Sequence, residues 1–143
     1  MTHISENLEV AFSTKQMYEL VNDVEAYPEF IPACKAASIS QRQENSLDAE
    51  LLLGKGGFTC KLKTRNTFYP YKRIDLNLLS GPFSSLQGTW TFIEQNNNSS
   101  IVQMNLDFQL KNKLFGLAFN KILQKISKEL VQSFHQRAQR LYA

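Results

Sequence analysis

The sequence predicts an α+β domain in which a curved antiparallel sheet wraps around one long helix. The chain has 143 residues, a length typical of a single domain with a substantial core. Between Cys34 and Leu110, apolar and polar residues alternate and turn-forming residues recur, which predicts about six antiparallel strands. The segment Leu114–Tyr142 has no proline and repeats its apolar residues at helical spacing. The apolar face of the sheet needs a cover, and this helix provides one.

The N-terminal part predicts one strand followed by short helices. Apolar residues alternate with polar ones over most of residues 3–12, as in a strand. Ser13 and Gln16 have the spacing of a capping box, so a helix should begin directly after Ser13. Pro28 and Pro32 interrupt the segment that follows, which leaves it only one or two helical turns.

Turn-forming residues separate the predicted strands of the sheet. They fall at residues 43–46, 54–57, 69–72, 80–84 and 96–99. The segment Gly54-Lys55-Gly56-Gly57 is glycine-rich, but it lacks the G-x-x-x-x-G-K-[ST] order of a phosphate-binding loop and joins two strands. We therefore expect a hairpin turn at this position.

The predicted C-terminal helix is sharply amphipathic. At about 100° per residue, its apolar side holds Phe115, Phe119, Ile122, Leu123, Ile126, Leu130, Val131, Phe134, Ala138, Leu141 and Tyr142. Arg137 projects into the middle of this side. Burying a guanidinium without a partner is costly, so Arg137 should either form an ion pair or face a ligand at a cavity mouth.

Positive charge is concentrated in the C-terminal part of the chain. The formal net charge is +3, yet residues 1–110 hold nine Lys and Arg against twelve Asp and Glu, whereas residues 111–143 hold seven against Glu129 alone. The outer face of the predicted helix presents Lys121, Lys125, Lys128 and Arg140. Such a face is either simply solvated or attracts an anionic partner, such as RNA phosphates or lipid headgroups. No DNA partner is predicted.

Few residues could support catalysis or metal binding. His3 and His135 are the only histidines, and both are expected to be solvated. Cys34 and Cys60 lie far apart and outside any C-x-x-C spacing, so two reduced structural thiols are expected. The carboxylates are scattered on the outward side of the strands and form no acid–base pair. We therefore expect no catalytic residue, no metal and no cofactor.

The sequence also predicts a location in the cytoplasm. No apolar stretch approaches the ~20 residues that a membrane-spanning helix needs. Residues 1–7 lack the basic and apolar regions of a secretory signal. Contact with a membrane is therefore expected to be peripheral.

Large apolar side chains from the sheet and the helices could enclose a ligand cavity. The candidate wall residues are Phe30, Ile31, Phe83, Leu86, Trp90, Phe92, Phe119, Leu123 and Ile126, with Arg137 at the mouth. Pockets for small apolar ligands combine such walls with a few polar groups. Because aromatic residues are also normal in a dry core, composition leaves both readings open.

Three motifs that together span nearly the whole chain occur in the order found in a known family. They are Tyr18-x-x-Val21-x-Asp23-Val24-x-x-Tyr27-Pro28-x-Phe30-x-Pro32-x-Cys34, then Gly81-Pro82-Phe83-x-x-Leu86-x-Gly88-x-Trp90-x-Phe92, and finally Arg137-Ala138-x-x-x-Tyr142. With these motifs the chain resembles the coenzyme Q-binding START-domain family. The resemblance implies a helix-grip fold of the START and Bet v 1 type over residues 1–143.

The resemblance also implies two different functions. In the coenzyme Q branch, a hydrophobic cavity holds ubiquinone or a related isoprenoid lipid for respiratory function, without chemical turnover. A bacterial toxin branch instead binds the large ribosomal subunit and interferes with subunit joining. The motifs do not separate the branches. We take ubiquinone or lipid binding as the first hypothesis and ribosome binding as the alternative; an enzyme acting on polyketides is weakened by the missing acid–base pair.

Overall fold

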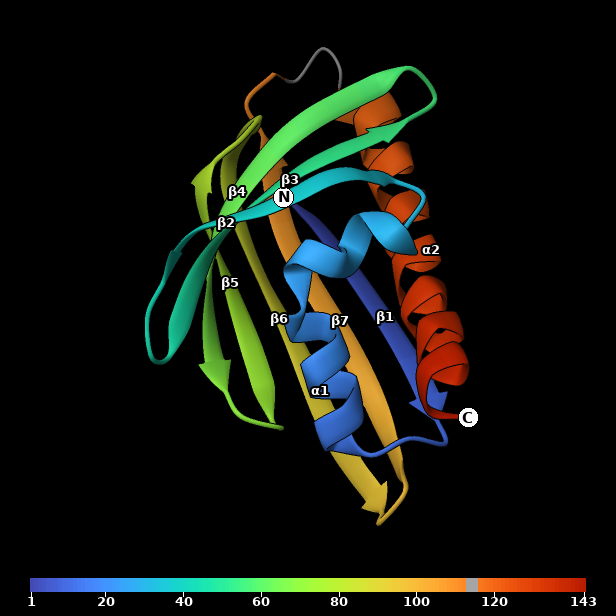
Figure 1. The fold of residues 1–143 in the computed structure, drawn as a ribbon. Coiled ribbons are helices and arrows are strands. Elements are labelled where there is room, and N and C mark those ends of the chain that lie inside the picture. Colours follow the sequence, from blue (N-terminus) through green and yellow to red (C-terminus); the bar gives the residue numbers. More distant parts are fainter. Residues whose placement is uncertain (113–115) are drawn as a thin grey trace.

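The computed structural model describes residues 1–112 and 116–143 and has the predicted α+β architecture (Figure 1). Its elements are β1 (Thr2–Val10), α1 (Thr14–Asn22), the 3-10 helix η1 (Val24–Glu29), β2 (Cys34–Arg42), β3 (Ser46–Lys55), β4 (Phe58–Tyr69), β5 (Arg73–Ser80), β6 (Phe83–Asn96), β7 (Ser99–Leu110) and α2 (Gly116–Tyr142). The predicted strands and turns are thereby confirmed. The predicted helix start at Leu114, and Phe115 on its apolar side, lie outside the described residues.

The strands form one antiparallel sheet in the order β1-β7-β6-β5-β4-β3-β2. Neighbours from β2 to β7 are joined by short turns, while β1 completes the sheet by pairing with β7, for example Leu8 with Val102. Figure 1 shows α1, η1 and α2 on the same side of this curved sheet. The helices therefore cover its apolar face, as the alternation of the strands requires.

Local sequence signals determine the start of α1 and the turn between β3 and β4. Ser13 Oγ accepts a hydrogen bond from the backbone N–H of Gln16 (3.1 Å), and Gln16 Oε1 accepts one from the backbone N–H of Ser13 (3.0 Å). This is the predicted capping box. Gly56 and Gly57 have φ of 59° and 85°, the left-handed values that both central residues of a type I′ hairpin need. The glycine-rich segment is thus a hairpin, as predicted.

The inner side of α2 enters the core. Its buried apolar residues are Leu123, Ile126, Val131, Phe134 and Ala138. At the C-terminal end of the predicted apolar side, Leu141 and Tyr142 are 53% and 36% exposed. The last turn of α2 reaches Phe12, whose ring centroid lies 6.0 Å from that of Tyr142, and leaves Leu141 in solvent. Helical phase alone could not show where the sheet ends beneath the helix.

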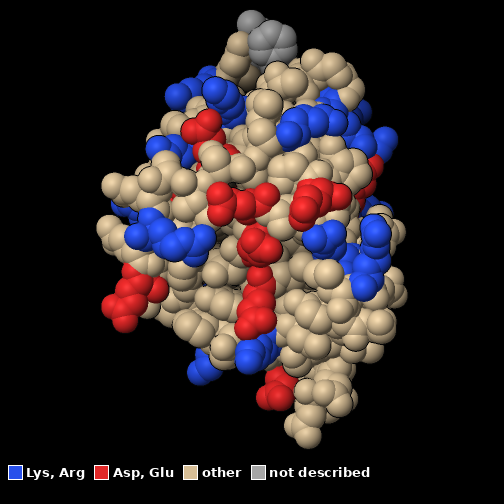
Figure 2. Space-filling model, viewed as in Figure 1, with Lys and Arg blue, Asp and Glu red and all other residues tan. Residues whose placement is uncertain are grey.

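The charge asymmetry of the sequence becomes two surfaces. Acidic side chains run down the centre of Figure 2 over α1 and η1, and basic side chains lie over α2 on the right. The exposed acidic residues of α1, η1 and the residue between them are Glu19, Asp23, Glu25 and Glu29. The predicted basic residues Lys121, Lys125, Lys128 and Arg140 are all exposed on α2. An anionic partner would therefore be attracted to α2 and repelled by the neighbouring helices.

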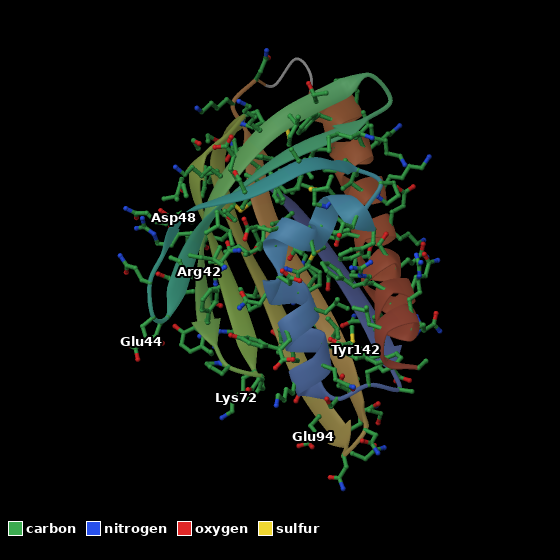
Figure 3. All side chains as sticks on the ribbon, in the orientation of Figure 1. Arg42, Glu44, Asp48, Lys72, Glu94 and Tyr142 are labelled. Atoms are coloured by element: carbon green, nitrogen blue, oxygen red, sulfur yellow. The ribbon has the colours of Figure 1, made fainter. Side chains whose placement is uncertain are left out.

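On the side of the sheet away from α2, Asp48, which is labelled in Figure 3, forms an ion pair with its cross-strand neighbour Arg65. Arg65 Nε and Nη2 donate to the two carboxylate oxygens at 2.8 and 3.0 Å. The hydrogen bonds from Arg65 lower the pKa of Asp48 below its ordinary value. Because the folded pKa lies below the unfolded one, this pair stabilises the fold at neutral pH, and its contribution is lost as pH falls through the folded pKa.

We expect Asp48→Asn to lower the free energy of unfolding at pH 7. The difference from wild type should shrink as pH falls below about 4, the ordinary range of an aspartate pKa. Urea unfolding at pH 7 and pH 3 measures both values. Glu44→Gln, in the exposed turn before β3, is the control. A difference that is the same at both pH values would contradict the assigned role of the Asp48–Arg65 pair.

Candidate ligand-binding cavity

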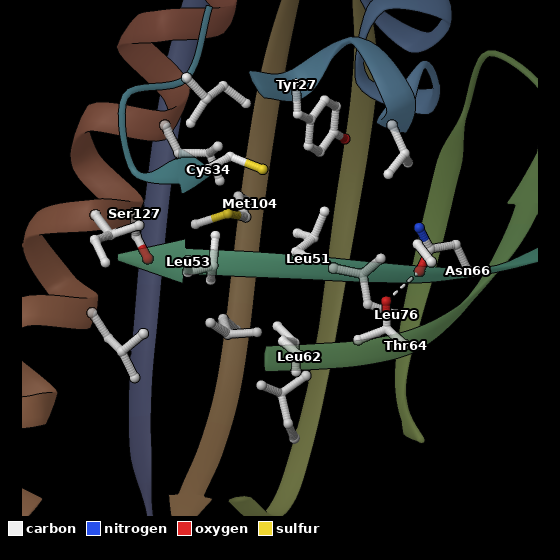
Figure 4. A pocket seen from close by; sticks show the side chains of 18 of the residues that line it. Tyr27, Cys34, Leu51, Leu53, Leu62, Thr64, Asn66, Leu76, Met104 and Ser127 are labelled. Carbon is white, nitrogen blue, oxygen red and sulfur yellow. Dashed lines mark hydrogen bonds between the residues drawn. The ribbon is translucent and has the colours of Figure 1, made fainter. Parts of the chain in front are cut away.

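A cavity of about 120 Å³ lies between the sheet, α2 and η1 (Figure 4). The described residues that line it are Val24, Tyr27, Ile31, Cys34, Ala49, Leu51, Leu53, Leu62, Thr64, Asn66, Leu76, Phe83, Leu86, Trp90, Met104, Leu106, Leu123, Ile126, Ser127 and Leu130. The strands contribute most of this wall, because each presents its apolar residues to the face that the helices cover. Figure 4 shows α2 at one end of the cavity and β4 at the other.

Six of the predicted wall residues line this cavity. They are Ile31, Phe83, Leu86, Trp90, Leu123 and Ile126. Phe30, Phe92 and Phe119 are not among its lining residues. Phe92 lies on the correct face of β6, but the ring of Tyr18 from α1 packs against it at 5.8 Å between centroids. Phe30 packs against Phe134 at 5.5 Å. For these two residues, neighbouring helices occupy the space that the sequence pattern assigned to a ligand.

Phe119 lines a second, more open hollow of about 280 Å³ at the N-terminal end of α2. The other residues around it are Phe58, Pro82, Leu110 and Asn112. The ring of Phe119 lies 6.3 Å from that of Phe83, which lines the inner cavity. The Phe83 and Phe119 rings therefore stand between the outer hollow and the inner cavity.

Arg137 is an ion-pair residue and is not among the residues that line the cavity. Its Nη2 donates to Glu29 Oε2 at 3.1 Å, and its guanidinium lies 4.9 Å from the centre of the Phe30 ring. Of the two alternatives that the sequence left open, the structural ion pair is thus observed. The ion pair links α2 to η1, and both of these elements contribute residues to the cavity wall.

Several polar lining residues were missed by the sequence analysis. The inward alternation that begins with Phe58 on β4 continues to Thr64 and Asn66, which are buried. Ser127 is buried on the inner side of α2. A signal for these residues existed, since their phase places them inward. Hydrophobicity alone does not mark these residues as core positions, because their side chains are polar.

The cavity is electrically neutral. No described lining residue carries a charged side chain. Burial raises the pKa of the Tyr27 phenol, whose hydroxyl donates to the backbone oxygen of Val21. Burial also raises the pKa of the Cys34 thiol, against a smaller lowering by its hydrogen bond to Ala36 O. Both groups are uncharged at neutral pH, so the cavity favours a neutral ligand.

Gly88, the second glycine of the second motif, lies directly behind the cavity wall. A Cβ atom added to Gly88 would lie 3.0 Å from Leu106 Cδ1 and 3.3 Å from Leu76 Cδ1. Both leucines line the cavity. A larger residue at this position would therefore crowd two side chains of the cavity wall.

Residues 1–112 and 116–143 contain neither a metal-binding cluster nor a membrane-spanning helix. In these ranges, no three His, Cys, Asp or Glu side chains come together as a metal site would require. The helices in the same ranges include none with the length and apolar character needed to cross a membrane. Cys34 and Cys60 are both free thiols, as predicted.

A curved antiparallel sheet closed over an apolar cavity by a long helix defines the class of helix-grip, START-like proteins. Residues 10–135 match the family described as polyketide cyclase / dehydrase and lipid transport, and the chain belongs to this family. A START superfamily protein from Mycobacterium smegmatis has the same fold, with a TM-score of 0.83 at 23% identity over 97% of this chain and 98% of that one. The fold and the family resemblance inferred from the sequence are confirmed.

Curated relatives represent both functional branches. The ribosome association toxin RatA of Escherichia coli is 35% identical over 143 residues, which cover 100% of this chain and 90% of the relative. The mitochondrial coenzyme Q-binding protein COQ10 of Dictyostelium discoideum is 27% identical over 138 residues, covering 94% of this chain and 67% of the relative. Both likenesses extend across the elements that form the cavity.

Proposed function

We propose that the protein binds a neutral, largely apolar ligand, with ubiquinone or a related isoprenoid lipid as the first candidate, and does not transform it. The observation that carries this proposal is the cavity, whose wall is apolar and uncharged apart from a few hydroxyl, thiol and amide groups. Such a wall is typical of sites that hold apolar ligands by shape and orient them with few polar groups.

The size of the cavity supports a ligand with one ring and a tail. At about 120 Å³, it is close to the ~150 Å³ of an apolar cavity that admits benzene. A longer isoprenoid chain would have to pass Phe83 and Phe119 into the outer hollow. Ubiquinone has this shape. The name of the COQ10 relative supports the same candidate.

The chemistry of the lining supports binding without turnover. Proton transfer at neutral pH needs a group that titrates near that pH. In the cavity, burial raises the pKa values of Tyr27 and Cys34 away from neutrality. The proposal therefore requires neither a catalytic residue nor a cofactor.

Ala49→Leu should weaken ligand binding without loss of the fold. Ala49 is buried on β3 and lines the cavity, so the added isopropyl group would occupy ligand space. We expect at least about a tenfold loss of ubiquinone affinity, and thermal denaturation that shows the variant still folded. Organic-solvent extraction of the purified protein, followed by uptake of added ubiquinone, measures occupancy.

Ala36→Leu is the matched control, because Ala36 is exposed on the adjacent strand β2. This variant should retain the ubiquinone content of wild type. A wild-type protein that yields no quinone on extraction and takes up none would remove the quinone proposal. Equal uptake by Ala49→Leu and wild type would show that a ligand binds elsewhere.

 

A second candidate function is association with the large ribosomal subunit. What supports the second candidate is the 35% identity to a relative named for ribosome association, over the whole of this chain. The exposed basic face of α2 independently favours an anionic partner. Glu129, the only acidic residue after residue 110, does not neutralise this face, because both of its oxygens lie 2.7 Å from Lys55 Nζ.

The same face could also contact an anionic membrane, where ubiquinone resides. Peripheral membrane contact would fit the first candidate function, and contact with ribosomal RNA would fit the second. Reversal of the lysine charges on α2, measured against both partners, distinguishes between them.

A further inference from the structure

Thr64 and Asn66 form a polar pair in an otherwise apolar part of the cavity wall. They lie two positions apart on β4, so both side chains point to the same face of the sheet. Thr64 Oγ1 donates to Asn66 Oδ1 at 2.7 Å, as the dashed line in Figure 4 shows. Both residues are only 7% exposed. Their neighbours in the wall include Leu62 and Leu76.

This hydrogen bond determines which atoms of the pair remain available. The Asn66 oxygen is engaged by Thr64, so the side-chain amide turns its N–H groups away from Thr64. The hydrogen bond between Thr64 and Asn66 uses only the amide oxygen, and Asn66 Nδ2 is not among the fully enclosed polar atoms of the described residues that lack a partner. Because Asn66 lines the cavity, its amide N–H groups are donors that a ligand oxygen can reach.

We infer that the Thr64–Asn66 pair is a hydrogen-bonding site for a carbonyl oxygen of the ligand. This inference rests on the proposed ligand-binding function and adds the ligand's chemistry and orientation to it. The ligand is a neutral ring that carries a carbonyl group, and the carbonyl oxygen accepts from Asn66 Nδ2. Thr64 is a positioning residue, because its hydroxyl holds the amide in the orientation that directs the N–H groups to the ligand.

Duroquinone and durene test this inference, because both are six-membered rings with the same four methyl groups, and duroquinone has two carbonyl groups where the aromatic ring of durene has two C–H groups. Trp90 is the only tryptophan and lines the cavity, so quenching of its fluorescence reports duroquinone binding. Competition against duroquinone then gives the affinity of durene. We expect Asn66→Leu, which removes the donor at similar size, to weaken duroquinone about tenfold and not to weaken durene.

Two further variants complete the experiment. Thr64→Val keeps the side-chain shape, removes the hydroxyl and should weaken duroquinone less than Asn66→Leu does. Asn77→Leu makes the same exchange at an exposed position of β5 and should leave both affinities unchanged. If Asn66→Leu does not fold, Thr64→Val still tests the pair, and the inference then fails if its duroquinone affinity equals that of wild type.

The outcomes separate this inference from the proposed function. Unchanged duroquinone affinity in Asn66→Leu, or an equal loss for durene, would overturn the carbonyl site while the cavity remained a binding site. Binding of neither compound to the wild-type protein would overturn the ligand-binding function, and the inference with it.

Discussion

Phe134→Ala should lower the free energy of unfolding by about 3–5 kcal/mol. Phe134 is 1% exposed and lies where α2, η1 and the sheet meet. Its ring centroid is 5.3 Å from those of Tyr27 and Trp90, in edge-to-face geometry. Truncation would remove these contacts and leave a void next to the cavity, where rigid neighbours limit collapse.

Chemical denaturation followed by circular dichroism measures this loss. Leu141→Ala on the same helix is the control, since Leu141 is 53% exposed and should change stability by less than about 0.5 kcal/mol. Phe134→Leu should lie between the two. A loss below about 1 kcal/mol for Phe134→Ala would show that Phe134 does not join these three elements as the structure indicates.

Reversing Lys121, Lys125 and Lys128 to glutamate should weaken ribosome association by about tenfold to a hundredfold at moderate salt, if α2 is the contact. All three side chains are exposed on one face of α2. Each phosphate contact contributes about 0.7–0.9 to the slope of log affinity against log salt. Cosedimentation with the large ribosomal subunit across a salt series measures affinity and slope together.

Reversal of Lys35, Lys61 and Lys72 is the matched control, because these exposed lysines lie outside α2 and change the net charge equally. Equal losses for both triple variants would indicate general charge attraction. Full retention of binding by the α2 variant would exclude this face as the contact. Binding to anionic vesicles, but not to the subunit, would favour the membrane as the partner of α2.

The strands, their turns and the start of α1 could be predicted because their signals are local. The capping box involves residues three positions apart, and a hairpin turn is specified by the residues within it. Phe92 shows the limit of this reasoning. Its position in the alternation of β6 correctly predicts a side chain that faces the helices, but the ring of Tyr18 from α1 packs against it. No periodicity within β6 contains that information.

Arg137 and the Thr64–Asn66 pair show two further features that sequence-based prediction reached only in part. The sequence predicted that Arg137 needs a partner, but Glu29 stands 108 positions away and only the packing of α2 against η1 brings them together. Thr64 and Asn66 had the right phase to face inward, yet which donor remains free depends on their hydrogen bond. That bond is a property of the folded cavity.

The sequence by itself determined the α+β class, the family and the division of charge between α2 and the rest of the chain. These follow from periodicity, motif order and composition, which are properties of the chain alone. Only the tertiary structure decided which side chains surround empty space, which polar groups face it and which charges are paired. The physical reason is that cavities and ion pairs are made by contacts between distant segments, and the geometry of those contacts exists only once the sheet has closed around α2.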